Sequence, residues 1–200
     1  MKPFRTFLFL LILGLLAGCG KIPQTQYYSI GSGLPPAPAA SSPAPLSFDV
    51  AVARFRAPQS LAQDRLLYRP GPNQVDYYAY HRWSGYPADQ VTAVFLTRLR
   101  SAGLFRTVTS MDGAPKADYL LRGGVENLEE VNSGTEVSAH VVLSMEVVDT
   151  KTHTVVWSGM RTSDKPVADR SVAGVVRELN EGVRQCVDEL TQGVAAHFRR

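Results

Sequence analysis

The strongest constraint on the fold is a stretch of alternating apolar and polar residues at 135–149. Its apolar members recur at every second position: Val137, Ala139, Val141, Leu143, Met145 and Val147. The positions between them are mostly polar: Glu136, Ser138, His140, Ser144 and Glu146. Successive side chains of a strand point to opposite faces of its sheet, so this pattern predicts a long strand with one buried and one solvated face. A sheet with one solvated face is usually antiparallel or mixed.

The other strands are predicted from apolar runs that are bounded by turn residues. They are expected at 48–52, 66–69, 75–83, 104–109, 118–131 and 155–161. The sequence Pro-Gly-Pro-Asn at 70–73 predicts a tight turn, because proline presets one backbone angle and glycine and asparagine tolerate unusual ones. The pair Gly123-Gly124 is expected to form a bulge in the strand 118–131.

Two helices are predicted, at 87–102 and 169–198. Pro87 suits the first position of a helix, and Gly103 suits the residue just after a helix ends. The second helix has apolar residues at helical spacing: Val172, Val176, Leu179, Val183, Cys186, Leu190 and Val194. Three glycines weaken this helix and are expected to mark close approach to the sheet: Gly174, Gly182 and Gly193.

The elements of the domain follow the order β-β-β-α-β-β-β-β-α. This order predicts a single α+β domain, with a mixed or antiparallel sheet and two helices packed on one face. We place the folded domain at 47–200. A chain of about 150 residues is long enough for one domain that buries about two thirds of its unfolded surface.

The N-terminus has the parts of a secretory signal. Two basic residues lie in the first five positions, the run 7–17 is apolar, and the letters LAGC stand at 16–19. The apolar run is too short to span a hydrocarbon core, which takes about 20 residues. The last four letters resemble the lipobox of bacterial lipoproteins. We therefore predict a signal peptide at 1–18 and a covalent lipid on Cys19; the alternative is an uncleaved anchor with a chance cysteine.

The lipid would attach the protein to a membrane. Each buried methylene contributes about 0.8 kcal/mol, so the three acyl chains of a mature lipoprotein make release negligible. Gly20 rather than aspartate follows the cysteine. By resemblance to lipoprotein sorting signals, this residue favours the periplasmic face of the outer membrane.

The segment 19–46 connects the lipidated cysteine to the domain. Its part 31–46 is rich in proline, alanine and serine and is predicted to be an extended linker. Within 27–30, the sequence Tyr-Tyr-Ser-Ile is expected to form a short strand. If that strand is loose, most of the segment is a long tether. If it docks on the domain, as its aromatic residues favour, the tether shrinks to Gly20–Gln26.

Charge and motifs argue against several functions. Two of the 21 basic residues lie in the signal peptide, which leaves 19 against 18 acidic residues and no basic surface for nucleic acid. The sequence has no nucleophile elbow and no Walker loop, and its histidines lack metal-ligand spacing. An enzyme, a metal site and a cofactor other than the covalent lipid are therefore not expected. The acidic stretch with Glu126, Glu129 and Glu130 is expected to be a solvated strand end.

Cys186 is the second of two cysteines, and the first is assigned to the lipid. Its position in the apolar pattern of the last helix favours a small buried residue. A reactive or cross-linking thiol is the alternative.

The segment 52–86 carries a denser motif than a generic fold requires. It contains RFRAP at 54–58, LYR at 67–69, GPN at 71–73 and YYAYHRW at 77–83. Together with YYSI at 27–30 and ADY at 117–119, this motif resembles the ABC-type transport auxiliary lipoprotein family, whose best-known member is the lipoprotein of the Pqi system. The resemblance extends from Cys19 to the final helix.

The resemblance implies a function. Such lipoproteins accompany an ABC transporter whose periplasmic partner carries MCE (mammalian cell entry) domains, in systems associated with moving phospholipids between the membranes. The chain would be a non-catalytic component that docks on the MCE-domain partner and fixes it to the outer membrane. One alternative is a structural or assembly lipoprotein without a transporter. Another is a lipid carrier, which would need a large apolar hollow.

Aromatic and basic residues in the motif form the predicted docking surface, because these types are enriched at protein interfaces. We assign partner binding to four residues: Arg69, Tyr78, Tyr80 and Arg82. Strand alternation places the last three on one face, opposite Tyr77, Ala79, His81 and Trp83. Trp83 is expected to be buried under the helix that follows it. The alternative is that the whole cluster is a hydrogen-bonded corner that orients this helix.

Overall fold

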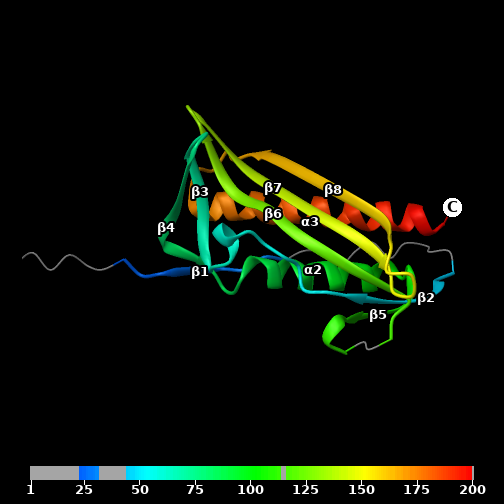
Figure 1. The fold of residues 1–200 in the computed structure, drawn as a ribbon. Helices are drawn as coiled ribbons and strands as arrows, with labels where there is room; N and C mark the ends of the chain where they lie inside the picture. The colour runs from blue at the N-terminus through cyan, green and yellow to red at the C-terminus, as the bar shows by residue number, and fades with distance from the viewer. Residues whose placement is uncertain (1–22, 32–43, 114–115, 200) are drawn as a thin grey trace, which may run out of the picture.

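The computed structural model describes residues 23–31, 44–113 and 116–199 (Figure 1). Eight strands form one sheet: β1 (Gln26–Tyr28), β2 (Leu46–Val52), β3 (Arg65–Gly71), β4 (Gln74–Trp83), β5 (Phe105–Ser110), β6 (Tyr119–Ser133), β7 (Glu136–Asp149) and β8 (Val155–Pro166). The helices are α2 (Pro87–Ala102) and α3 (Val172–Phe198), with short 3-10 turns η1 (Gln59–Leu61) and η2 (Met111–Gly113). The expected α+β domain is therefore confirmed.

The sheet is mixed, and β6 is its central strand. β6 pairs antiparallel with β7, which in turn pairs antiparallel with β8. Along its other edge, β6 pairs in parallel with β2 and then with β3, each over a short stretch. β4 and β1 extend the sheet beyond β3, and β5 extends it beyond β2. β8 runs past its predicted end at Arg161 to Pro166, because β7 offers pairing as far as Ser138.

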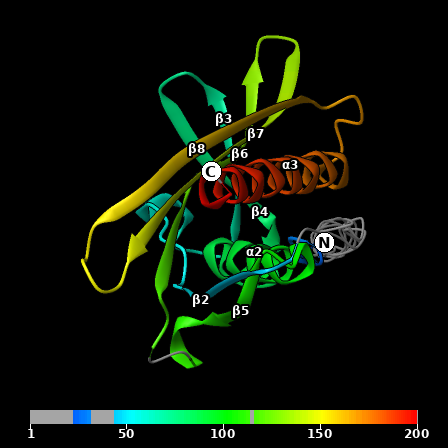
Figure 2. The ribbon, with the colours of Figure 1, turned by 90° about the vertical axis from the view of Figure 1, so that its right-hand side faces the viewer.

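α2 and α3 lie next to each other and pack on the sheet (Figure 2). The inner face of β7 carries the predicted alternating residues, and Val141 and Leu143 are completely buried there. Val183 and Leu190 of α3 are completely buried as well. Each such side chain contributes about 1.5–3 kcal/mol when it is removed from water, so apolar burial holds this layer together.

Two of the three glycines of α3 mark close contact with the sheet, as predicted. A Cβ atom on Gly182 would lie 2.9 Å from Cγ2 of Val141, and one on Gly193 would lie 2.7 Å from Cζ2 of Trp157. Gly174 instead lies against Asp169, in the turn before the helix. Its small size therefore serves the start of the helix rather than contact with the sheet.

The bulge predicted at Gly123-Gly124 is wrong. Both glycines pair regularly with β7, and the irregularity lies between Val125 and Asn127. A side chain on Gly123 would collide with the ring of Phe55, which is buried beneath the sheet. Close packing by a distant aromatic ring, and not a local change of backbone register, is what requires glycine at this position.

α2 begins and ends where the sequence predicts. Pro87 occupies its first position, and Gly103 follows its end with a φ of +58°, a left-handed conformation that glycine adopts without strain. Phe95 and Leu99 on its inner face are completely buried, whereas Val94 is only partly buried. Within the described ranges, neither helix combines the length and the apolar character needed to span a bilayer.

The short strand predicted near the N-terminus docks on the domain. β1 pairs in parallel with β4, so that Tyr27 lies beside Arg82. Ile30 is 7% exposed, and its backbone nitrogen donates to Oε1 of Gln90 at 2.8 Å. The alternative of a long loose tether up to the domain is therefore wrong. The predicted signal peptide, Cys19 and the linker residues 32–43 lie outside the described residues.

Candidate docking surface

The residues assigned to partner binding lie on the β3–β4 hairpin, which closes at the predicted turn. The hairpin is irregular: Leu67 pairs with Tyr77, but Arg65, only two positions earlier in β3, pairs with Arg82. β4 therefore contains extra residues between Tyr77 and Arg82, and the strict alternation of its side chains is lost there.

This irregularity overturns the predicted division of β4 into two faces. Tyr78 and His81 were expected on opposite faces, yet their rings contact edge to face with centroids 5.5 Å apart. His81 also contacts Tyr28 of β1, whose hydroxyl lies 3.0 Å from Nδ1 of His81. Tyr78 therefore belongs with His81 and β1, and not with Arg82.

Arg69 forms an ion pair with a buried carboxylate. Its Nη2 donates to both carboxylate oxygens of Glu129 at 3.1 Å, and the side-chain amide of Asn127 donates to the same carboxylate at 3.1 Å. Glu129 is only 2% exposed. A buried charge is tolerated when it is paired and hydrogen-bonded in this way, and removing one partner is costly.

Tyr78 is held by Glu130, the residue that follows Glu129 in β6. Its hydroxyl donates to Oε2 of Glu130 at 2.7 Å, and Glu130 is 5% exposed. Burial and this carboxylate raise the pKa of Tyr78, so the phenol stays protonated as a donor. The prediction that Glu129 and Glu130 form a solvated strand end is therefore wrong, since both acids are enclosed by the hairpin that crosses them.

Arg82 and Trp83 fasten the end of β4. Nη1 of Arg82 donates to Oδ1 of Asp64 at 2.7 Å, in the loop before β3. Trp83 is 1% exposed and packs in the apolar core at the start of α2. Tyr80 differs from these neighbours, because it is 41% exposed. The hairpin thus presents Tyr80 on a backbone that several directional bonds hold in place.

The sequence did not predict that Glu129 and Glu130 are the buried partners of Arg69 and Tyr78. Glu129 and Arg69 lie 60 positions apart, and Glu130 and Tyr78 lie 52 positions apart. No local pattern links such pairs. A pair of adjacent glutamates inside an apolar strand was the available signal, because two carboxylates there need partners.

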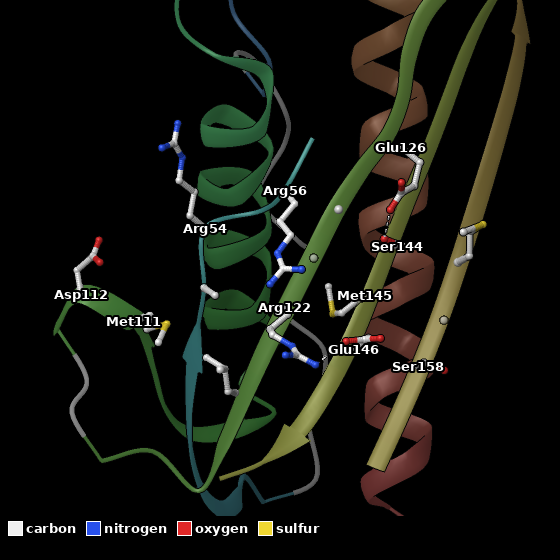
Figure 3. Close-up of a pocket in the computed structure, with 16 residues that line it drawn as sticks. Arg54, Arg56, Met111, Asp112, Arg122, Glu126, Ser144, Met145, Glu146 and Ser158 are labelled. Atoms are coloured by element: carbon white, nitrogen blue, oxygen red, sulfur yellow. Dashed lines mark hydrogen bonds and ion pairs between the residues drawn. The ribbon is translucent and has the colours of Figure 1, made fainter. Parts of the chain in front are cut away.

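A groove of about 760 Å³ lies over the polar face of β6, β7 and β8, with α3 behind these strands (Figure 3). Its other wall is the segment after β2 together with η2. The charged residues that line it are Arg54, Arg56, Asp112, Arg122, Glu126 and Glu146. Several of these charges are already satisfied: Arg122 donates to Glu146 at 2.8 Å, and Ser144 donates to Glu126 at 2.5 Å. Met111, Leu120, Met145 and Met160 line the groove as well, so its lining mixes charged and apolar side chains.

Reactive groups are scarce in the described part of the chain. No three residues among its histidines, cysteines and acids come together as a metal site. Cys186 is completely buried in α3, and burial raises the pKa of its thiol to about 11. The thiol is therefore protonated at neutral pH, which agrees with the expected buried apolar residue and not with a reactive one.

Known proteins share the sequence pattern and the fold described above. A family model described as an ABC-type transport auxiliary lipoprotein component matches residues 28–191. A crystal structure of a Xanthomonas campestris protein assigned to DUF330 has a TM-score of 0.75 at 20% identity, and the match covers 88% of this chain and 98% of the other. The crystal structure of an uncharacterized protein has a TM-score of 0.66 at 12% identity, covering 86% and 99%. At these identities the structures show the fold alone, and no curated protein matches the chain.

Proposed function

The chain belongs to the ABC-type transport auxiliary lipoprotein family, and from this premise we propose that it is the non-catalytic, outer-membrane-anchored component of an intermembrane lipid transport system. The family match over residues 28–191 is the observation that carries the proposal. An ABC transporter supplies the ATP hydrolysis in this scheme. The lipoprotein docks on a periplasmic partner with MCE domains and fixes that partner to the membrane.

The anchor in this proposal is the lipid on Cys19. The basic start, the short apolar run and the LAGC box at 16–19 support it, and Gly20 supports the outer membrane as the destination. The folded domain would then act close to the bilayer, because β1 begins only a few residues after the lipidated cysteine.

The docking surface in this proposal is the β3–β4 hairpin, with Arg69, Tyr78, Tyr80 and Arg82 as its partner-binding residues. Tyr80 makes the central contact, because its ring is exposed while the other three have partners within the chain. Those bonds hold the hairpin in one conformation. A preordered surface loses less conformational entropy on binding, so the same contacts yield a higher affinity.

The test is co-purification of the tagged lipoprotein from detergent-solubilised cell envelope, followed by mass spectrometry of the captured proteins. Three forms are compared: the parent chain, Tyr80→Ala, and Val75→Ala as a control at an exposed position on the same strand. We expect an MCE-domain protein with the parent and the control, and about tenfold less with Tyr80→Ala, as for a moderate interface hot spot. Circular dichroism checks that all three are folded.

Other outcomes separate the alternatives. Capture of only outer-membrane or cell-wall scaffolding proteins would sink the transport proposal and favour a structural lipoprotein. Capture of the MCE-domain protein in equal amounts by all three forms would keep the transport role and move the docking surface away from Tyr80. Charge reversal by Arg82→Glu is less informative, because it also breaks the ion pair with Asp64.

A further inference from the structure

Two exposed aromatic residues mark the corner where β1, the end of β4 and the start of α2 meet. Tyr27 is 64% exposed and Tyr86 is 51% exposed. The backbone nitrogen of Ser84 donates to the carbonyl oxygen of Tyr28 at 2.6 Å. Tyr27 and Tyr86 therefore lie within two residues of the same hydrogen bond, and they belong to one corner of the surface.

This corner is firmly attached to the rest of the domain. β1 pairs with β4 over its whole length, with Tyr28 opposite the buried Trp83. Beyond β1, the backbone nitrogen of Gly31 donates to Oδ1 of Asn180 in α3 at 2.7 Å. A force applied through the N-terminal chain therefore acts on the whole domain and not on a loose segment.

The corner is also where the chain comes from its anchor. If Cys19 is lipidated, as the proposed function holds, only Gly20–Thr25 separate it from β1, which begins at Gln26. The seven steps from Cys19 to Gln26 span at most about 25 Å, since an extended chain rises about 3.3–3.6 Å per residue. The β1 corner is consequently confined to the vicinity of the headgroups, whatever the rest of the domain does.

We propose that Tyr27 and Tyr86 rest in the headgroup region of the bilayer that holds the lipid, so that the β1 corner faces the membrane. Tyrosine has an apolar ring and a polar hydroxyl, and it is enriched at membrane–water interfaces for this reason. The inference rests on the lipid anchor of the proposed function. It adds an orientation: the β7–β8 turn, at the opposite end of the domain, points away from the bilayer (Figure 1).

The test places a tryptophan reporter at each site in the full lipidated protein, reconstituted in vesicles of phosphatidylethanolamine and phosphatidylglycerol. The variants are Tyr27→Trp, Tyr86→Trp and, as a control at the far end, Val155→Trp, which replaces a residue that is 48% exposed. Brominated phospholipid quenches tryptophan that touches the bilayer. The parent already contains Trp83 and Trp157, so its fluorescence is subtracted from that of each variant. The difference is measured in vesicles with and without brominated phospholipid.

We expect quenching at positions 27 and 86 to exceed that at 155 by about twofold or more, as contact with the interface requires. Two further variants test whether the rings themselves hold the corner down: Tyr27→Trp with Tyr86→Ser, and Tyr86→Trp with Tyr27→Ser. In each, quenching of the remaining reporter should fall. Unchanged melting temperatures would exclude unfolding as the cause.

Each contrary result has a distinct meaning. If all variants float with the vesicles but are quenched equally, the anchor stands and the membrane contact is overturned. If the parent does not associate with vesicles at all, both the anchor and the inference fail. If reporters at 27 and 86 respond to an added MCE-domain protein and not to bromine, the corner is a protein interface and the inference is overturned.

Discussion

The two hairpins of the sheet are stabilised in different ways. In the β6–β7 hairpin, the apolar side chains of β7 alternate regularly and pack against α3. In the β3–β4 hairpin, the register slips, and an ion pair to Glu129 and a hydrogen bond to Glu130 connect the hairpin to β6. Apolar burial is non-directional and tolerates many detailed arrangements, whereas a buried carboxylate requires particular donors at particular places.

This comparison teaches where each hairpin should be vulnerable. The β6–β7 hairpin should lose stability when a buried apolar side chain is shortened. The β3–β4 hairpin should lose stability when a single hydrogen-bonding atom is removed. The difference also suits their proposed roles, because a docking surface needs residues held in one geometry, while the helix-covered layer needs only to stay folded.

The largest effect is expected from a cavity in the helix-covered layer. Leu143→Ala removes a completely buried side chain of β7 and should lower the free energy of unfolding by about 2–5 kcal/mol. Denaturation in urea measures this change. Ser158→Ala, at an exposed position of β8, is the matched control and should stay within about 0.5 kcal/mol of the parent. Equal effects at both sites would contradict the assigned burial.

Loss of one charge in the β3–β4 hairpin should lower the free energy of unfolding nearly as much as the cavity in β7. Arg69→Met leaves the carboxylate of Glu129 buried without its cation and should cost about 3 kcal/mol of stability. Adding Glu129→Gln removes the stranded charge, so the double variant should recover at least about 1 kcal/mol. Urea denaturation of the complete double-mutant cycle tests the pair. Additive losses would show that the two residues are not coupled.

A smaller effect is expected when a single hydroxyl is removed. Tyr78→Phe keeps the ring but deprives Glu130 of its donor, which should cost about 1–2 kcal/mol. Tyr80→Phe makes the same change on an exposed ring and should be neutral. Thermal melts of the two variants are compared with the parent. A cost at Tyr80 as large as at Tyr78 would argue against a special role for the buried bond.

The smallest effect concerns a directional pair at the surface between β2 and β5. Hydrogen bonds from Arg106 and Thr107 lower the pKa of Asp49 to about 2. A carboxyl with a lowered folded-state pKa contributes stability that is fully present above its unfolded value near 3.9 and is lost as the pH falls through its folded value of about 2. The parent should therefore be more stable than Asp49→Asn at neutral pH, and the difference should shrink below about pH 4 and vanish below about pH 2. Melts across this range measure it, and a gap that is constant with pH would exclude the ionised pair as its cause.

Prediction from the sequence succeeded where the pattern was local. The limits of α2, the turn at 70–73 and the inner face of β7 follow from spacing, proline and glycine. It failed at Gly123, because the ring that requires glycine there comes from Phe55, in the segment after β2. It also failed along β4, since the extra residues after Tyr77 are visible only in the pairing with β3.

The sequence by itself determined the fold class, the family and the residues that could carry a docking surface. Each of these depends on periodicity, on the order of the elements or on short motifs, all of which are present along the chain itself. Tertiary structure alone decided that Arg69, Tyr78 and Arg82 have partners within the chain and that Tyr80, Tyr27 and Tyr86 are exposed. The physical reason is that exposure and pairing depend on which distant side chain arrives opposite, and a buried carboxylate can be satisfied only when the chain has already brought its donor across the sheet.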